Sequence, residues 1–297
     1  SASGGHTTTV FFDGRLISGD PAIPYYPQKY KGNTYYPLSY LGHRFYPLAY
    51  LWRTTPVVLI GLGAVLVGLI TGRNKPQVRR KIWIIAALGL FSILFMVFMD
   101  QGAKKFDRYL LPSFLTLDLL AGLGLVIVVR WARSKVGSNQ NKGLFLLLAG
   151  FVIIWQVVGT FFTFPYYLSY YNPLMGGGEK AQKVMMVGWG EGLDQAAVQL
   201  NGNMEPQDLK VMSYYPDGCF SYFFEGETIH AASEWDETKQ RLASVDYVVL
   251  YIHQWQRQLP FSEMLDFFKE QTPVAVIRIN QIEYAQIYDM KAVTLPE

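Results

Sequence analysis

Four long apolar runs set the strongest limit on what this chain can fold into. Three of them contain no charged side chain and the fourth contains only Asp118; they are residues 55–72, 82–99, 143–164 and 110–129. Each run approaches the roughly 20 residues with which an α-helix, rising about 1.5 Å per residue, crosses the hydrocarbon core of a bilayer. The pattern predicts a polytopic α-helical membrane protein with about four transmembrane helices at these positions.

The loops between the runs predict the orientation of the helices, because cationic side chains are retained in the cytoplasm during insertion. Two loops are strongly basic and should be cytoplasmic: residues 73–81, with Arg73, Lys75, Arg79, Arg80 and Lys81, and residues 130–142, with Arg130, Arg133, Lys135 and Lys142. Residues 1–53, 100–109 and 165–297 then lie outside the cytoplasm, in a multi-pass protein of the plasma or inner membrane. The loop at 100–109 is also basic, against the rule, and this needs a separate explanation.

The segments on either side of the transmembrane region, residues 54–164, differ in composition. Residues 1–53 are rich in Tyr, Pro and Gly, which predicts an extracytoplasmic segment with its rings at the membrane interface or along a groove for a lipid substrate. Because the chain starts without an initiator Met, we expect that more sequence precedes it.

Residues 165–297 alternate short runs of β-branched and aromatic residues with helical patterns, which predicts a small extracytoplasmic α/β domain. The expected strands are residues 209–214, 219–224, 245–251, 274–279 and 284–288, and the expected helices are residues 191–201, 234–243 and 262–271.

Charge and cysteine content narrow the classes of function. The formal net charge is only +3, which is too small for a nucleic-acid footprint. Cys219 is the single cysteine, and the four histidines show no spacing typical of metal ligands. We therefore expect no internal disulfide, no metal site, no cofactor and no nucleic-acid partner.

The basic packet at residues 104–109, Lys-Lys-Phe-Asp-Arg-Tyr, is the clearest candidate binding site. Ammonium and guanidinium groups at a membrane surface make strong hydrogen bonds to phosphate. Lys104, Lys105 and Arg108 are therefore candidates for binding a lipid-linked phosphate. In the alternative interpretation the lysines meet ordinary lipid phosphates and Arg108 pairs with Asp107 or Asp100.

Two further residues are candidates for a site. A carboxylate inside a membrane helix costs about 2.5 to 3.5 kcal/mol on insertion scales, so Asp118 should either hydrogen-bond, for instance to Gln156, or line a substrate cavity. Glu191 lies in the glycine-rich segment at residues 188–192. That segment is either a tight turn or a contact with a substrate at the membrane surface, because glycine-rich turns before helices can bind phosphate.

Several stretches together resemble the dolichyl-phosphate-mannose-protein mannosyltransferases, glycosyltransferase family 39 of the GT-C superfamily, and their bacterial relatives. The stretches are the packet with its Leu-Leu-Pro continuation at residues 104–112, Gly5-His6 with residues 11–14, residues 46–56, residues 167–174 and residues 188–193. The resemblance implies an enzyme that moves a sugar from a polyprenyl-phosphate donor to an extracytoplasmic protein, lipid or glycan acceptor. It also implies that Lys104, Lys105, Arg108 and Tyr109 bind the donor phosphate, and that His6 is a site candidate.

The resemblance implies a catalytic carboxylate in a first external loop, which we expect to lie upstream of this chain, so this portion alone is expected to be inactive. A second hypothesis keeps the membrane helices but makes the protein non-catalytic, with an α/β domain that binds a partner or a glycan. Membrane lipids are partners in either case.

Overall fold

The computed structural model describes residues 11–12, 15–16, 28–30, 33–35, 44–72, 76–101, 106–135, 141–232, 234–257 and 259–295. The chain divides into two compact units. We call them the helical unit, chiefly residues 38–165 with 171–177, and the sheet unit, chiefly residues 178–297 with 166–170. Two short hairpins lie near the start of the chain: β1–β2 (Phe11–Phe12, Arg15–Leu16) belongs to the helical unit and β3–β4 (Gln28–Tyr30, Asn33–Tyr35) to the sheet unit.

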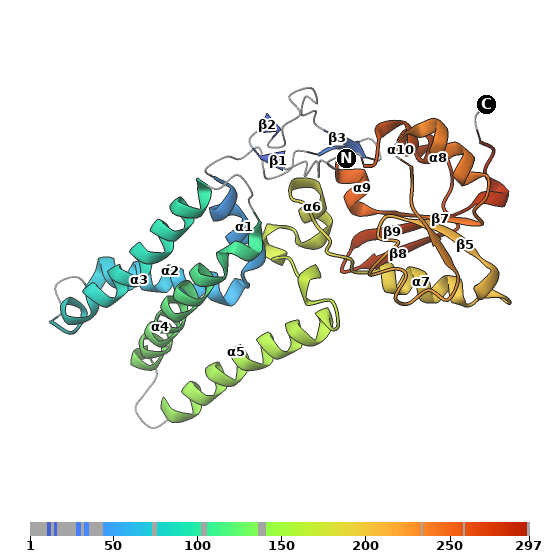
Figure 1. Ribbon diagram of the computed structural model, residues 1–297. Coiled ribbons are helices and arrows are strands. Elements are labelled where there is room, and N and C mark those ends of the chain that lie inside the picture. Colours follow the sequence, from blue (N-terminus) through green and yellow to red (C-terminus); the bar gives the residue numbers. More distant parts are fainter. Residues whose placement is uncertain are drawn as a thin grey trace. The chain divides into compact units, whose positions relative to one another are not determined.

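Each predicted apolar run forms a long helix in the helical unit (Figure 1). The helices are α2 (Pro56–Gly72), α3 (Pro76–Asp100), α4 (Leu111–Lys135) and α5 (Asn141–Thr163). Among the described residues, two helices are long and apolar enough to cross a membrane, Ile82–Asp100 and Asp107–Ala132. The number rises to four if each bent pair counts as one span: Phe45–Arg53 with Pro56–Thr71, and Ala149–Thr163 with Tyr167–Met175.

Small residues allow α2 and α4 to pack closely. A Cβ added to Gly61 would lie 2.4 Å from the carbonyl oxygen of Ala121, and one added to Gly124 would lie 1.7 Å from the carbonyl oxygen of Gly61. Only glycine permits backbones to approach this closely, as in many helix pairs of membrane proteins.

The sequence did not predict α1 (Phe45–Arg53), which lies in the segment interpreted as interfacial. Its buried residues include Tyr46, Ala49 and Tyr50, and this spacing of three and four places one stripe of the helix against the protein. The helix ends before Thr54, which is extended, and the residue that precedes Pro56 also disfavours helix. A bend of 118° therefore separates α1 from α2.

Among its described residues, the sheet unit contains a sheet of five strands in the order β6-β5-β7-β9-β8. Strands β6 (Glu227–Ile229), β5 (Lys210–Ser213) and β7 (Tyr247–Tyr251) are parallel, whereas β9 (Ile282–Asp289) is antiparallel to both β7 and β8 (Ala275–Ile279). The sheet is therefore mixed, and the described protein is mostly helical with a small α/β unit.

Helices cover the two faces of the sheet (Figure 1). On one face Met212, Val248 and Leu250 form a core with residues of α8 (Trp235–Leu242) and α10 (Ser262–Lys269). On the other face α7 (Leu193–Asn201) buries Leu193, Ala196, Ala197 and Leu200. The remaining helices are α6 (Gly177–Val184) and α9 (Ile252–Arg257), and short 3-10 turns lie at Asp107–Leu110, Tyr167–Ser169, Pro173–Met175, Pro206–Asp208 and Met290–Ala292.

Four of the five predicted strands and all three predicted helices of this region are confirmed, with shifted ends. The strand predicted at 219–224 is wrong, because these residues form turns. Phe220 and Phe224 are buried with ring centroids 5.1 Å apart, whereas Tyr222 and Phe223 are exposed. The aromatic run therefore buries every fourth residue, and the alternation that a strand needs is absent. The short strand β6 and helices α6 and α9 were not predicted.

Candidate functional site

The basic packet falls partly outside the described residues. Lys104 and Lys105 belong to the undescribed segment 102–105, and His6 lies in the undescribed segment 1–10. The described remainder is Phe106 followed by the single turn Asp107–Leu110, which leads directly into α4. Arg108 and Tyr109 are therefore held at the start of a long apolar helix.

The acid of the packet pairs with an arginine distant in sequence. Arg53 Nε lies 2.5 Å from Asp107 Oδ2, and the two side chains are only 11% and 15% exposed. The other carboxylate oxygen, Oδ1, accepts the backbone N–H of Arg108 at 2.8 Å. The carboxylate of Asp107 thus pairs with Arg53 and not with the guanidinium of Arg108, which was one of the alternatives considered from the sequence.

A third segment joins this pair at the end of α1. The Arg53 guanidinium carbon lies 4.2 Å from the centre of the Tyr171 ring. Asn172 is fully buried; its backbone N–H donates to the Trp52 carbonyl at 2.7 Å, and its side-chain amide donates to the Leu51 carbonyl at 2.9 Å. These bonds satisfy carbonyl groups that the last turn of a helix leaves without partners. Residues 51–53, 107–108 and 171–172 therefore form one cluster.

The guanidinium of Arg108 lies over aromatic rings. Its central carbon is 4.8 Å from the centre of the Phe106 ring and 5.6 Å from that of Tyr109, and the residue is exposed. Stacking uses the flat face of a guanidinium, whereas bidentate recognition of phosphate uses its N–H edge. Phosphate binding is thus chemically compatible with this placement of Arg108.

The structure does not contain the hydrogen bond predicted between Asp118 and Gln156. The amide of Gln156 donates to Thr55 Oγ1 at 3.3 Å, and Asp118 is exposed on α4. Thr55 immediately precedes α2, so its hydroxyl can reach α5, which the sequence alone does not indicate.

Glu191, in the sheet unit, occupies a turn in which three glycines have positive φ: 102° at Gly188, 112° at Gly190 and 83° at Gly192. Three amides of the turn already have oxygen acceptors. Trp189 N–H donates to Glu191 Oε2 at 2.5 Å, Gly190 N–H to the Tyr251 hydroxyl at 2.8 Å, and Gly192 N–H to Asp194 Oδ1 at 3.1 Å. This pattern favours the tight-turn interpretation over a phosphate-binding loop, because the amides that would bind phosphate are used.

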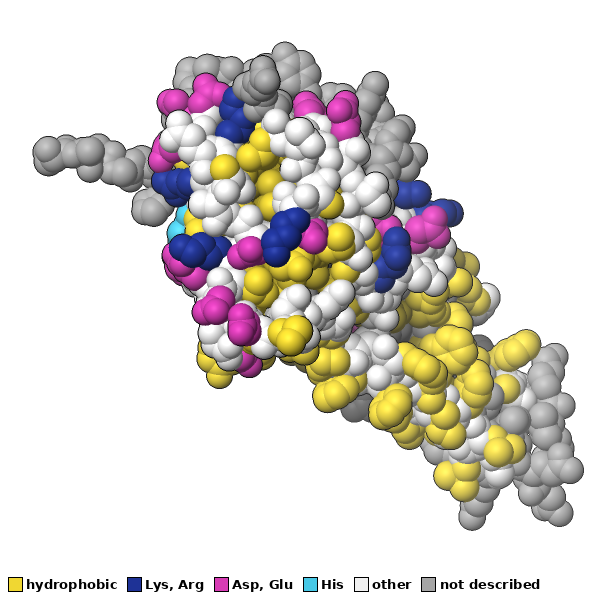
Figure 2. Space-filling model, turned by 90° about the vertical axis from the view of Figure 1, so that its right-hand side faces the viewer, with side chains coloured by type: hydrophobic (Ala, Val, Ile, Leu, Met, Phe, Trp, Pro, Cys, Tyr) yellow, Lys and Arg dark blue, Asp and Glu magenta, His cyan; other side chains and the backbone are white. Residues whose placement is uncertain are grey.

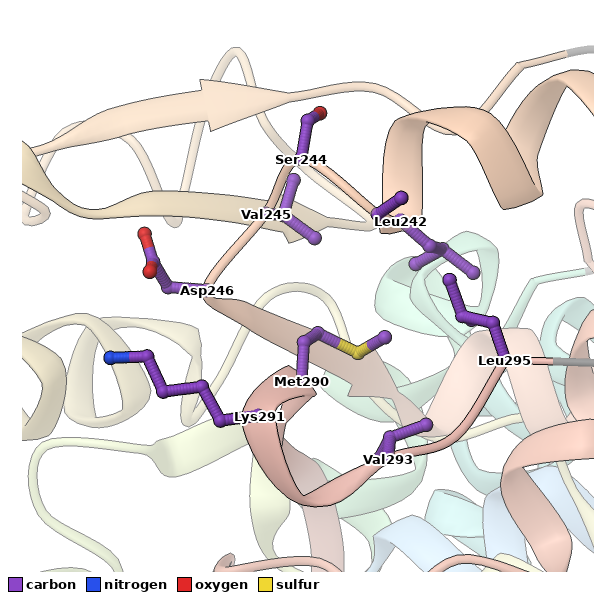
Figure 3. Close-up of a pocket in the computed structure, with 9 residues that line it drawn as sticks. Leu242, Ser244, Val245, Asp246, Met290, Lys291, Val293 and Leu295 are labelled. Carbon is purple, nitrogen blue, oxygen red and sulfur yellow. The ribbon is translucent and has the colours of Figure 1, made fainter.

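One cavity of about 300 Å³ lies in the sheet unit, next to the start of β7 (Figure 3). Leu242, Met290 and Leu295 point toward one another across it, whereas the charged ends of Asp246 and Lys291 point to one side. Its lining is mostly apolar, with Asp246 and Lys291 as its charged residues. Within the described ranges, no group of three or more His, Cys, Asp or Glu is placed to hold a metal ion.

Of the site residues expected from the sequence, Arg108 and Tyr109 lie side by side in the helical unit, Asp118 lies farther along α4, and Glu191 belongs to the sheet unit. Sequence reasoning missed Arg53, Asp107 and Asn172 as members of the cluster, together with Tyr171. The sequence did contain an indication of these four residues, because each lies in one of the stretches on which the resemblance to the mannosyltransferases rests.

Comparison with known proteins gives no match to this chain among protein-family models, curated proteins or solved structures.

Proposed function

We propose that the chain is part of a membrane glycosyltransferase that moves a sugar from a polyprenyl-phosphate donor to an extracytoplasmic acceptor. The observation that carries the proposal is the exposed guanidinium of Arg108, stacked on two aromatic rings at the start of the apolar helix α4. The resemblance of residues 104–112 to the mannosyltransferase-type enzymes supports the same function.

The membrane topology is a further part of the proposal. Helices α2 to α5 cross the plasma or inner membrane, with residues 73–81 and 130–142 on the cytoplasmic side. The packet and the sheet unit then share the extracytoplasmic side, where a polyprenyl-phosphate sugar exposes its head group. The basic loop at 100–109 has a reason to violate the charge rule there, since it binds an anion.

In this sugar transfer the role of the packet is to stabilise the leaving phosphate. As the bond from the sugar to the phosphate breaks, negative charge grows on the phosphate oxygens, and donors fixed in place stabilise it most effectively. Arg108 supplies such a donor together with Lys104, Lys105 and the hydroxyl of Tyr109. The Arg53–Asp107 pair acts indirectly: it anchors the turn that carries Arg108, because Asp107 also accepts the Arg108 backbone N–H.

The test uses the full-length gene product with Arg108→Ala and Arg108→Lys. Hydrogen bonds to a charged group contribute about 1.5 to 3 kcal/mol, so Arg108→Ala should lower kcat roughly ten- to a hundredfold. Arg108→Lys keeps the charge but loses the planar fork, and should fall between Arg108→Ala and the unchanged protein. The measurement is sugar release from a polyprenyl-phosphate donor.

Arg130→Ala is the matched control, because Arg130 is also exposed on α4 but at its other end. It should leave turnover unchanged. An Arg108→Ala protein that unfolds normally and turns over like the unchanged protein would remove Arg108 from the site. A protein with no turnover on any donor would favour the non-catalytic alternative.

A further inference from the structure

The order of the parallel strands in the sheet unit contains a point, between β5 and β7, where the direction of the chain connections reverses. Strand β5 lies between β6 and β7 and is parallel to both. After β5 the chain leads to β6 on one side, and after β7 it leads toward β8 and β9 on the other. Where connections from adjacent parallel strands leave in opposite directions, a crevice opens outside the carboxyl ends of the strands, and α/β proteins bind ligands there.

Aromatic and polar side chains gather at this edge. Tyr214 and Tyr215 directly follow β5, Tyr251 ends β7, and His253 comes two residues later. The Tyr215 hydroxyl lies 3.2 Å from His253 Nδ1, and the Tyr215 and Tyr251 ring centroids are 5.7 Å apart. Tyr251 and His253 are buried, whereas Tyr214 and Tyr215 are partly exposed. The partly exposed rings of Tyr214 and Tyr215 therefore lie at the surface of this edge, and the buried polar groups of Tyr251 and His253 form a polar floor beneath them.

Two oxygen atoms close to this floor have no hydrogen-bond partner within the described part of the chain. One is Glu191 Oε1, which is buried; its neighbour Oε2 accepts the Tyr251 hydroxyl at 3.3 Å. The other is Ser213 Oγ, in a residue only 5% exposed. Ser213 is paired with Val249 in the sheet, so Ser213 and Tyr251 lie on the same face, because side chains alternate along a strand.

Buried polar atoms without partners are costly and rare in native proteins, so a ligand that supplies partners would be favoured. The charge of the site indicates whether an anionic or an uncharged ligand would bind. Glu191 is a carboxylate, and the nearby amides of residues 189, 190 and 192 already donate to protein oxygens. An anion would therefore meet a like charge and find these donors occupied. Burial and the Glu191 charge raise the pKa of Tyr251, which keeps its hydroxyl a donor to Glu191.

We propose that the carboxyl ends of β5 and β7 form a binding site for a sugar. Glu191 Oε1 and Ser213 Oγ accept hydrogen bonds from ring hydroxyls, and Tyr214 and Tyr215 contact the apolar face of the ring. A sugar combines O–H donors with an apolar face, as this set of side chains requires. The proposal rests on the sheet unit alone and holds whether or not the helical unit transfers a sugar.

The experiment measures saturation-transfer NMR and tryptophan fluorescence on the whole chain in lauryldimethylamine oxide, a detergent without a sugar head group. The probes are mannotriose, maltotriose, chitotriose and glucosamine, with inorganic phosphate as the anionic counterpart. We expect at least one of the sugars to bind with a millimolar or lower Kd, and phosphate not to bind at this edge. Failure of all four sugars to bind, or binding of phosphate at this edge in the unchanged protein, overturns the proposal.

Variants then locate the site. Glu191→Gln should weaken sugar binding at least tenfold and Ser213→Ala about threefold or more. Glu227→Gln, at an exposed carboxylate on the neighbouring strand β6, is the matched control and should leave binding unchanged. If Glu191→Gln perturbs the turn and unfolds the unit, Ser213→Ala carries the test, because it removes one buried oxygen that holds nothing else in place. Sugar binding that survives Ser213→Ala at full strength, in protein with unchanged thermal unfolding, places the sugar elsewhere and contradicts the proposal.

Discussion

The helical unit and the sheet unit differ in the exposure of their large apolar side chains. Large hydrophobic side chains stay exposed along the long helices, among them Ile70, Trp83, Phe98 and Phe161. In the sheet unit such side chains are mostly inside, and charged side chains of both signs gather on its surface (Figure 2). Exposing apolar surface to water costs about 25 cal/mol per Å². One solvent cannot suit both units, and the helical unit has the surface that contact with lipid requires.

The two units also place their ion pairs differently. Arg53 and Asp107 in the helical unit are 11% and 15% exposed, whereas in the sheet unit Arg278 is 60% exposed and its partner Glu283 is 18% exposed, so the two pairs differ in the exposure of the arginine. Charges removed from water depend on their partners far more than exposed charges do. Removing one partner from each pair should therefore cost the helical unit much more stability than the sheet unit.

The largest expected effect is that of Asp107→Ala. Removing one partner of a buried pair costs about 3 to 5 kcal/mol, and Asp107 also holds the Arg108 backbone N–H. We expect the helical unit to lose about 3 kcal/mol of stability, near the lower end of that range because both side chains retain some exposure. Thermal unfolding in detergent measures it.

A double-mutant cycle supplies the control for this prediction. Arg53→Leu combined with Asp107→Leu should cost clearly less than the sum of the two single changes, because neither charge is then left behind. Additive costs would show that the two side chains do not depend on each other, and the contrast with the sheet unit would disappear.

The next largest effect should come from Gly188→Ala in the sheet unit. Gly188 has φ of 102°, and a Cβ there would lie 2.5 Å from the Tyr251 hydroxyl. A strained backbone of this kind costs about 1 to 3 kcal/mol, and we expect about 2 kcal/mol in chemical unfolding of the unit. Gly218→Ala is the matched control, since nothing lies within 4 Å of its Cβ position. Equal stability of the two variants would contradict the account of the turn.

Sequence alone indicated the apolar helices and most of the sheet, and it offered a tight turn at residues 188–192 as one of two interpretations, because local patterns mark each of these features. Runs without charge mark long apolar helices, and clustered glycines mark a turn that needs positive φ. The strand prediction at 219–224 was wrong because it followed the aromatic composition of the run. The spacing of Phe220 and Phe224 is not the alternation that a strand needs. Helix α1 was not predicted, because the Tyr- and Pro-rich composition of its segment indicated an interfacial stretch, whereas the spacing of Tyr46, Ala49 and Tyr50 indicates a helix.

The clusters could not be predicted in the same way, because they join residues far apart in sequence. Arg53 and Asp107 are 54 positions apart, and Asn172 reaches back 121 positions to Leu51. No local pattern states that these residues meet; only the path of the helices brings them together. The same holds at the sheet edge, where Glu191 meets Tyr251 across 60 positions.

The sheet unit should also respond to alkaline pH through a buried tyrosine. Burial, followed by the charge of Glu283, raises the pKa of Tyr288 above its ordinary value of 10.0. The folded unit keeps this proton at a pH where the unfolded chain has lost it. Stability is therefore unaffected well below pH 10 and falls above it, by up to about 1.4 kcal/mol per pH unit. Chemical unfolding between pH 8 and pH 11 measures the slope.

Tyr288→Phe should reduce that slope without removing it, because burial also raises the pKa of Tyr251, and it removes the hydrogen bond that the hydroxyl donates to Gln286 Oε1 at 2.8 Å. Tyr222→Phe, at a position that is 84% exposed, is the matched control and should keep the slope of the unchanged protein. An unchanged slope in Tyr288→Phe would mean that other groups govern the alkaline loss of stability.

The smallest effect should be that of Arg278→Ala, and it completes the comparison with Asp107→Ala. Arg278 Nη2 lies 2.7 Å from Glu283 Oε1, a distance similar to that in the Arg53–Asp107 pair, but the arginine side chain is largely in contact with solvent. Exposed pairs contribute about 0.2 to 1 kcal/mol, so we expect a loss of about 0.5 kcal/mol. Added salt should reduce this loss further, because exposed charges are screened, while the cost of Asp107→Ala should change little. A loss at Arg278 as large as that at Asp107, or one that salt does not reduce, would mean that burial is not what distinguishes the two pairs.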